Sequence, residues 1–224
     1  MLRDVTVRCT VRLAVASDRS LVADAVAAAL SRSDVCVVRI PWPAARGDPV
    51  PGWPEDVDPP DLALMLCDLN PWSVEAAQRV VAAYPARWVL LTDTPRGPAW
   101  GAMLEAGVAR VLSSTTTMAE ILGLIAALRE GIGQLDQPDR EELVHAWRQV
   151  LPERVVARAK LASLTPRERE VLRLLHLGHT VQRIAEEHGV AVSTVRSQVR
   201  AVLRKLGVKS QLAAVAHYDR WADD

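Results

Sequence analysis

The sequence predicts two domains: an α/β domain with a five-stranded parallel sheet, and a C-terminal domain built only of helices. Short apolar runs alternate with helical runs over residues 11–130. This alternation is typical of a parallel sheet with helices on both faces. Residues 164–224 show only helical periodicity, interrupted by glycines. The chain has 224 residues, enough for two domains that each bury a core.

Five strands and four helices are expected in the first domain, which we place at residues 1–131. The predicted strands are residues 11–17, 34–40, 61–67, 87–92 and 109–113. The predicted helices are residues 19–33, 73–83, 99–106 and 118–130. Apart from its first residue, the third strand is a continuous apolar run, as expected for a strand that is buried on both faces.

One segment of the first domain departs from the alternation. Residues 41–60 contain seven prolines in twenty positions. Proline lacks a backbone N–H and clashes inside a helix, so we expect an extended loop here instead of a helix. The two tryptophans of the segment, Trp42 and Trp53, are interpreted either as lids over the core of the domain or as a contact for a partner or ligand.

Residues 132–163 are predicted to form a helical linker. Its apolar residues recur at alternating steps of four and three, a heptad spacing that Arg154 interrupts once. Pro152 indicates a kink, or a new helix that starts just before it. Two interpretations stay open. The helix packs on the predicted helix 118–130, or it forms a two-stranded stalk in which Leu143, Trp147 and Val150 join two copies of the chain.

The C-terminal domain, residues 164–224, begins with clear helix signals. Thr165 and Glu168 form a predicted capping box, with Pro166 at the first helical position. Gly178 ends this helix, and Thr180 caps a short second helix that ends at Gly189. The order of helix, short helix, glycine turn and longer helix is that of a helix-turn-helix.

The longer helix lies in Ser193–Lys209, STVRSQVRAVLRKLGVK, and is amphipathic. Its predicted apolar stripe is Val195, Val199, Val202, Leu203 and Leu206. The opposite face carries five basic residues, and the stretch contains no acidic residue. Although the net charge of the whole chain is zero, residues 165–209 hold nine basic and four acidic residues. A local basic surface of this kind fits the phosphate-lined major groove of DNA, while the alternative is a solvated surface helix.

Three motifs in order, LTPREREVL, RIAEEHGV and STVRSQVRAVLRKLGVKS, resemble the DNA-binding domain of LuxR/NarL/FixJ-type regulators. The resemblance implies that the third helix of the domain enters the major groove. Arg196, Ser197 and Arg200 would then face base edges, and Thr194, Arg204, Lys205 and Lys209 would lie near phosphates. The fourth helix of the family pairs two copies, which makes Leu212, Val215 and Ala216 dimer candidates.

The sequence departs from the family pattern at several positions. Gln198 stands where the family usually has histidine, and Ala191 occupies a position that often caps the recognition helix. Either Ser193 takes over the capping or the helix begins without a side-chain cap. The start of the second helix, residues 181–183, is less polar than usual. These departures affect the DNA sequence that is recognised rather than the mode of binding.

The order of elements in the first domain resembles the flavodoxin-like receiver domain of response regulators. In that family an aspartate after the third strand accepts a phosphoryl group, and two acids after the first strand help to hold Mg²⁺. A lysine after the fifth strand and a Thr or Ser after the fourth contact the phosphoryl group. Of these positions, only the threonine is matched fully here, by Thr92.

The other receiver positions are altered. Ser17 and Asp18 follow the first strand, one acid where the family has two, and the lysine position holds Ser113. Alignment on Pro71 puts Cys67 at the acceptor position, with Asp68 one residue later, whereas alignment on strand length puts Leu66 there. We therefore predict a degenerate, orphan-type receiver controlled by dimerisation, a protein partner or a small ligand. The alternative is a phosphorylation-dependent regulator that uses Asp68.

These features together predict a cytoplasmic, DNA-binding transcription regulator that works as a homodimer on double-stranded promoter DNA. No enzyme, cofactor or metal site is expected. The five histidines lie outside any nucleophile pattern, and no glycine-rich phosphate loop follows a strand. No apolar run is long enough to span a membrane, and charges interrupt the N-terminus, so we expect no membrane partner and no signal peptide. Cys9, Cys36 and Cys67 fit no zinc spacing and are expected to be free thiols.

Overall fold

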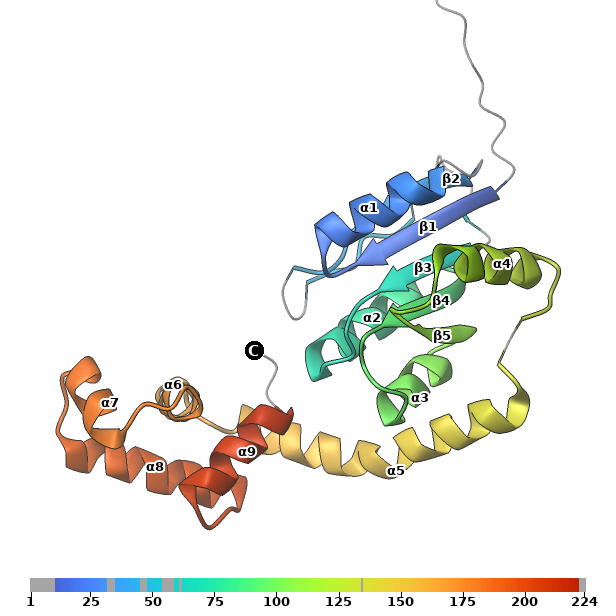
Figure 1. Cartoon of the computed structure of the whole chain (residues 1–224). Helices are drawn as coiled ribbons and strands as arrows, with labels where there is room; N and C mark the ends of the chain where they lie inside the picture. Colours follow the sequence, from blue (N-terminus) through green and yellow to red (C-terminus); the bar gives the residue numbers. More distant parts are fainter. Residues whose placement is uncertain are drawn as a thin grey trace, which may run out of the picture. The chain divides into compact units, whose positions relative to one another are not determined.

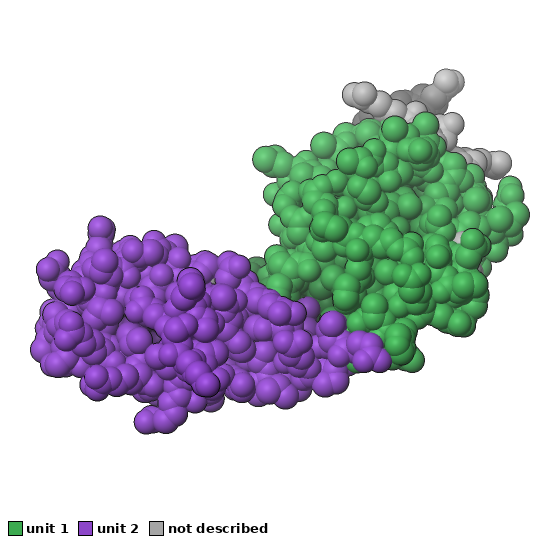
Figure 2. Space-filling view, turned by 60° about the horizontal axis from the view of Figure 1, so that its bottom comes forward, with its two compact units in different colours: residues 1–148 green, residues 149–224 purple. Residues whose placement is uncertain are grey.

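The structure is a computed structural model that describes residues 11–31, 35–44, 48–53, 59–60, 62–133 and 135–221. The chain divides into two compact units, residues 1–148 and 149–224 (Figure 2). Cys9 and the predicted strand starts at residues 34 and 61 lie outside the described residues. In the described ranges, no helix is both long and apolar enough to cross a membrane.

The first unit is built on a five-stranded parallel sheet. The strands are β1 (Val11–Ser17), β2 (Val35–Ile40), β3 (Leu62–Leu66), β4 (Arg87–Thr92) and β5 (Arg110–Ser113). All neighbours pair in parallel, in the order β2-β1-β3-β4-β5 (Figure 1). This is the flavodoxin-like order, in which the direction of strand succession across the sheet reverses between β1 and β3. The predicted fold class is confirmed, and the carboxyl ends of β1 and β3 lie side by side at this switch point.

Four helices cover the two faces of the sheet: α1 (Ser20–Leu30), α2 (Pro71–Ala83), α3 (Pro98–Glu105) and α4 (Met118–Arg129). Buried side chains of α1 and α4 share one core with alternate residues of β1, β3 and β4. Since side chains alternate across a strand, the remaining strand residues face α2 and α3 on the other side of the sheet (Figure 1). β3 is almost wholly buried, as its continuous apolar run predicted, whereas the edge strands β2 and β5 are buried only in part.

The proline-rich segment forms no helix or strand in its described parts, residues 41–44, 48–53 and 59–60. Its middle part is held against α2. Arg79 donates a hydrogen bond to the carbonyl oxygen of Asp48 at 2.8 Å, and the Tyr84 hydroxyl donates one to Pro51. Trp53 packs edge-on against the Tyr84 ring, with 6.0 Å between ring centroids. Trp53 therefore acts as a lid, whereas Trp42 lines a pocket that is described below.

The predicted linker is one helix, α5 (Gln137–Ala162), with Pro152 inside it. Its first half packs on α3, so the expectation that it would pack on the helix now labelled α4 is wrong. Leu143 and Trp147 are buried, and Arg140 donates hydrogen bonds to the carbonyl oxygens of Leu104 and Val108. The close approach depends on the missing side chain of Gly101, because a Cβ there would collide with the Leu143 carbonyl.

The second unit contains four further helices: α6 (Pro166–His176), α7 (Val181–His188), α8 (Val192–Leu206) and α9 (Gln211–Trp221). The predicted capping box at Thr165 is present, and Thr180 caps α7. Gly189 and Gly207 have φ values of 62° and 72°, the left-handed conformation that ends a helix and favours glycine. The second half of α5 adds Leu161 to the core formed by α6, α8 and α9.

The cysteines differ from the prediction of free thiols. Cys67 is free and buried, as expected. Cys36 on β2 is disulfide-bonded, so the prediction is wrong for this residue. An odd number of scattered cysteines gave no signal for a bond, because pairing depends on distances that only the fold determines.

Candidate nucleic-acid interface and receiver-like pocket

Helix α8 buries the apolar stripe that the sequence predicted. Val195, Val199, Val202 and Leu206 are at most 9% exposed, and Leu203 is half-buried. Val195 and Val199 pack with buried residues of α6 and α7, while Val202 and Leu206 pack with α6 and α9. The helix is therefore fixed about its own axis, and this decides which of its side chains face solvent.

The predicted DNA-contacting residues lie mostly on the solvent side of α8. Thr194, Arg196, Ser197, Arg200, Arg204 and Lys209 are all exposed. The described residues place no carboxylate in an ion pair with Arg196, Arg200 or Arg204. The Ser197 hydroxyl donates a hydrogen bond back to the Ser193 carbonyl at 3.0 Å. We call the surface formed by Arg196, Arg200 and Arg204 the α8 basic face. It offers three guanidinium groups to a polyanion.

Lys205 differs from these arginines. Its Nζ lies 2.6 Å from a carboxylate oxygen of Glu168 at the start of α6, and 3.0 Å from the Ser163 carbonyl oxygen. The side chain is only 29% exposed. Lys205 consequently has an intramolecular partner that competes with the phosphate contact implied by the family resemblance. Sequence reasoning missed this pair because its residues lie 37 positions apart.

The two ends of α8 are asymmetric. Ala191 is the N-cap residue and makes no side-chain capping bond, so of the two alternatives the helix without a side-chain cap is the observed one. Its first N–H groups have no helical carbonyl as partner, which gives this end of the helix a partial positive charge. Gly207 closes the other end, followed by α9.

The three dimer candidates of α9 lie in different environments. Leu212 is 79% exposed, an unusual state for a large apolar side chain, and Ala216 is also exposed. Val215 is partly buried against the core of its own unit. Ser210 begins the helix by accepting a hydrogen bond from the Ala213 N–H at 3.1 Å. In α5, the candidate Val150 is half-buried, and Leu143 and Trp147 are buried against α3.

At the switch point of the sheet, the fold brings together most of the predicted receiver positions. Five of the six predicted positions line a cavity of about 260 Å³: Ser17, Asp18, Cys67, Asp68 and Thr92. The sixth, Ser113, is outside its lining and makes a hydrogen bond with Thr115. Two residues that the sequence reasoning missed also line the cavity. Arg19 forms an ion pair with Asp68, and Asp93 accepts a hydrogen bond from Ser114.

Burial and neighbouring charges shift the pKa values of two groups that line this cavity. Burial raises the pKa of the Cys67 thiol strongly, and the carboxylates of Asp18 and Asp68 raise it further. The thiol is therefore protonated and a poor nucleophile. Burial also raises the pKa of Asp18, which accepts a hydrogen bond from the Ser73 hydroxyl. Throughout the described ranges, no three His, Cys, Asp or Glu side chains lie close enough together to hold a metal ion.

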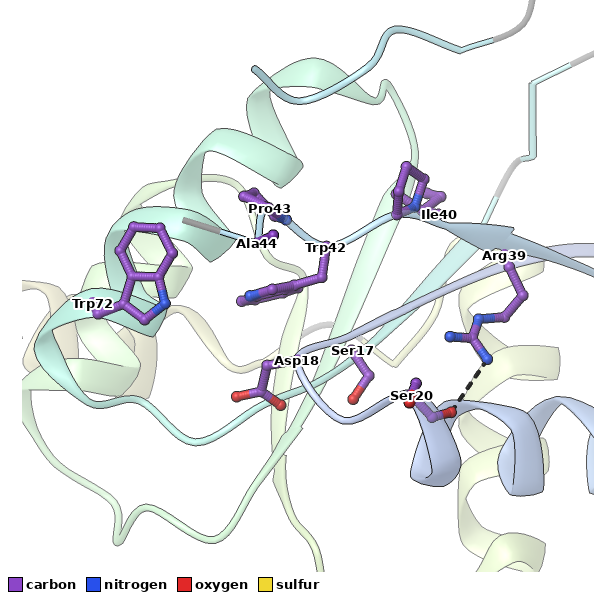
Figure 3. Close-up of a pocket in the computed structure, with 10 residues that line it drawn as sticks. Ser17, Asp18, Ser20, Arg39, Ile40, Trp42, Pro43, Ala44 and Trp72 are labelled. Carbon is purple, nitrogen blue, oxygen red and sulfur yellow. Dashed lines mark hydrogen bonds between the residues drawn. The ribbon is translucent and has the colours of Figure 1, made fainter. Parts of the chain in front are cut away.

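A second, larger cavity of about 550 Å³ opens beside the first and shares Ser17 and Asp18 with it. Figure 3 shows Asp18, Trp42 and Trp72 toward one end of this cavity and Arg39 toward the other. Arg39 forms an ion pair with Asp24 and contacts the Ser20 carbonyl. The lining therefore combines two indole rings, a carboxylate and a guanidinium whose charge is already balanced.

Comparisons with known proteins bear on both units. Residues 162–218 match the family model "Bacterial regulatory proteins, luxR family". The response regulator protein VraR of Staphylococcus saprophyticus is 30% identical over 163 residues, which cover 70% of this chain and 73% of VraR. The chain belongs to the response regulators with a LuxR-type domain.

Other relatives of this response regulator match shorter stretches. The transcriptional activator RamA of Corynebacterium glutamicum is 42% identical over 77 residues, which is 34% of this chain and 26% of RamA. LiaR of Bacillus subtilis is 31% identical over 121 residues, 51% of this chain and 54% of LiaR. The chain thus spans only part of these two proteins. Among solved structures, RcsB of Salmonella typhimurium has a TM-score of 0.41 and 19% identity, with 94% of this chain and 98% of RcsB covered.

The Lys205–Glu168 pair gives a prediction on pH dependence. Burial raises the pKa of Glu168, but hydrogen bonds from Lys205 and Thr165 outweigh it, and the pKa lies below the ordinary 4.5. A carboxyl group whose pKa is lower in the folded state than in the unfolded state stabilises the fold at pH values above its unfolded-state pKa. This stabilisation is lost as the pH falls through its folded-state pKa. We expect Lys205→Met to reduce the stability of the second unit by about 1–3 kcal/mol near neutral pH, because Glu168 loses its charged partner.

Hydrogen exchange of the α6 and α8 amides in the full chain measures this loss. In the wild type, protection should fall as pH drops through the range where glutamate titrates, and the fall should be smaller in Lys205→Met. Lys209→Met, a change of the same kind at an exposed lysine next to the same helix, is the control and should leave protection unchanged. Equal protection in all three proteins would contradict the assignment.

Proposed function

We propose that this response regulator is a sequence-specific, DNA-binding transcription regulator that works as a homodimer and is not controlled by conventional aspartate phosphorylation. The observation that carries the DNA-binding part is the α8 basic face. Its three arginines are exposed and unpaired within the described residues, on a helix whose opposite side is fixed in the core. A helix presented in this way fits the major groove of double-stranded DNA, and arginine is the commonest residue in specific contacts with guanine.

The roles within the interface follow from the family resemblance. By that resemblance, Arg196, Ser197 and Arg200, which are all exposed on α8, would face base edges. Thr194, Arg204 and Lys209 would contact phosphates and fix the register of the helix on the duplex. Lys205 would act on DNA only indirectly, by tying the recognition helix to α6 through Glu168.

The homodimer is proposed to form through α9. Leu212 supports this, since it is a large apolar side chain left exposed on a helix whose other side is buried. Val215 is partly buried against the core of its own unit, and Leu143 and Trp147 are buried against α3. We therefore favour Leu212 and Ala216 over the α5 residues as dimer contacts. A two-fold dimer would read two half-sites about one helical turn, ~10 base pairs, apart.

Control without phosphorylation rests on the altered pocket. Phosphoryl transfer to a carboxylate needs a divalent cation that neutralises the developing charge. Here Asp18 and Asp68 are the acids that line the site next to β1 and β3, and Asp68 is engaged by Arg19. The second candidate mechanism, phosphorylation of Asp68, is favoured by one observation: its side chain is 33% exposed at the pocket. The third candidate mechanism is control by a small-molecule effector that binds the receiver-like unit.

No catalytic role is assigned to this chain. A regulator of promoter DNA acts in the compartment that holds the chromosome, so we place it in the cytoplasm. Both assignments depend on the proposed DNA binding.

Arg200→Ala and Arg204→Ala should have different effects on DNA binding. A selection from random duplexes with the wild type first supplies the preferred sequence. We expect Arg200→Ala to weaken binding to that sequence by about 1–3 kcal/mol and to abolish preference at one base position. Arg204→Ala should weaken binding to all sequences alike. A repeated selection with each variant provides the measurement, and an unchanged base preference in Arg200→Ala would show that the base-reading role is wrong.

Acetyl phosphate tests the mode of control. Incubation of the full chain with acetyl phosphate and Mg²⁺ should leave the intact mass unchanged, because the pocket lacks the acid set that binds the cation. Asp68→Asn is the matched control for any adduct. A stoichiometric mass increase of one phosphoryl group that disappears in Asp68→Asn would contradict the proposal and establish the second mechanism.

A further inference from the structure

The larger of the two cavities has a lining that selects for a particular chemistry. Trp42 and Trp72 contribute indole rings, and Asp18 contributes a carboxylate at the same end (Figure 3). The guanidinium of Arg79 lies 5.7 Å from the centroid of the Trp72 ring, so this ring already makes a cation–π contact with a neighbour. Indole faces carry a negative potential and attract cations, most of all cations with weak hydration.

A second observation, independent of the first, also points to a ligand. The indole Nε1–H of Trp42 is buried and has no hydrogen-bond acceptor within the described residues. A buried donor without an acceptor costs free energy, and native structures usually satisfy such groups with protein, water or a ligand. Trp42 lines a cavity of about 550 Å³, which is large enough to hold a small organic molecule, and a turn of the Trp42 ring would bring its Nε1–H to an acceptor on that molecule.

Other ligand classes fit the lining less well. An anion would meet the carboxylate of Asp18, and the cation that lines the opposite end, Arg39, is already paired with Asp24. A hard metal ion prefers several oxygen ligands, whereas this end of the cavity offers a single carboxylate beside two apolar rings. A neutral apolar molecule would leave the carboxylate of Asp18 without a partner.

We propose that this cavity binds a small organic cation of the substituted-ammonium class that also carries a hydrogen-bond acceptor. The cationic group lies against the rings of Trp42 and Trp72 beside the carboxylate of Asp18, and the acceptor receives the Nε1–H of Trp42. The proposal rests on the proposed function, because it names the ligand class through which the receiver-like unit is controlled in place of a phosphoryl group.

Choline is a suitable probe, because it combines a quaternary ammonium group with a hydroxyl acceptor. Its neutral isostere, 3,3-dimethylbutan-1-ol, has the same shape without the charge. Isothermal titration of the full chain should show saturable binding of choline, and the neutral alcohol should bind at least about tenfold more weakly. Absence of choline binding, or equal binding of the two compounds, would overturn the proposal.

Variants assign the binding to this cavity. Asp18→Asn and Trp42→Leu should each weaken choline binding by about tenfold or more. Trp53→Phe is the matched control, since Trp53 packs on Tyr84 away from the cavity lining, and it should bind like the wild type. Circular dichroism of each variant checks that it folds. Unchanged choline binding in Asp18→Asn with a folded protein would contradict the assignment.

DNA binding measured on the same samples separates the two proposals. Choline binding without any DNA binding would refute the proposed function and leave the cavity assignment intact. DNA binding without choline binding would refute the cavity assignment and leave the function intact. If both hold, choline should also change the affinity for the selected DNA, because an effector must bind two states of the protein differently.

Discussion

Burial of one side of α8 is the constraint on which the rest of the second unit depends. Four apolar side chains, Val195, Val199, Val202 and Leu206, pack against α6, α7 and α9 and fix the rotation of the helix. Because the helix cannot turn, its three arginines must face solvent, where no carboxylate of the described residues pairs with them. The hydrophobic core therefore determines the position of the charges, and the charges determine which ligand the surface can bind.

The basic residues of the second unit fall into two groups, one paired within the fold and one exposed to solvent. Lys205 lies at the edge of the buried side and is used within the fold, where it joins the capping box of α6 to α8. Arg200 and Arg204, on the opposite side, are exposed and make no ion pair with the described residues. In the receiver-like unit, the fold brings Asp18, Asp68 and Thr92 together at one cavity, where Arg19 pairs with Asp68 and the buried Cys67 also lines the wall.

Sequence reasoning succeeded where a local pattern determines the structure. The periodicity of α8, the helix-ending glycines and the continuous apolar run of β3 depend on neighbours within a few residues, and all appear as predicted. It failed where distant groups meet. The packing of α5 on α3 depends on Gly101, which has no signal of its own, and the Lys205–Glu168 pair joins two helices that sequence spacing does not relate. The cavity beside Trp42 was likewise hidden, because its lining comes from segments that only the sheet order brings together.

The salt dependence of DNA binding tests the central claim most directly. The claim is that the α8 basic face meets a polyanionic duplex, and the affinity of the full chain for a fixed duplex, measured by fluorescence anisotropy at several salt concentrations, reports this contact. The logarithm of the binding constant should fall linearly with the logarithm of the salt concentration. The slope should drop by about 1 in Arg204→Ala and stay unchanged in Arg129→Ala, which removes the same charge from α4. An affinity that does not depend on salt, or equal slopes in all three proteins, would contradict the account.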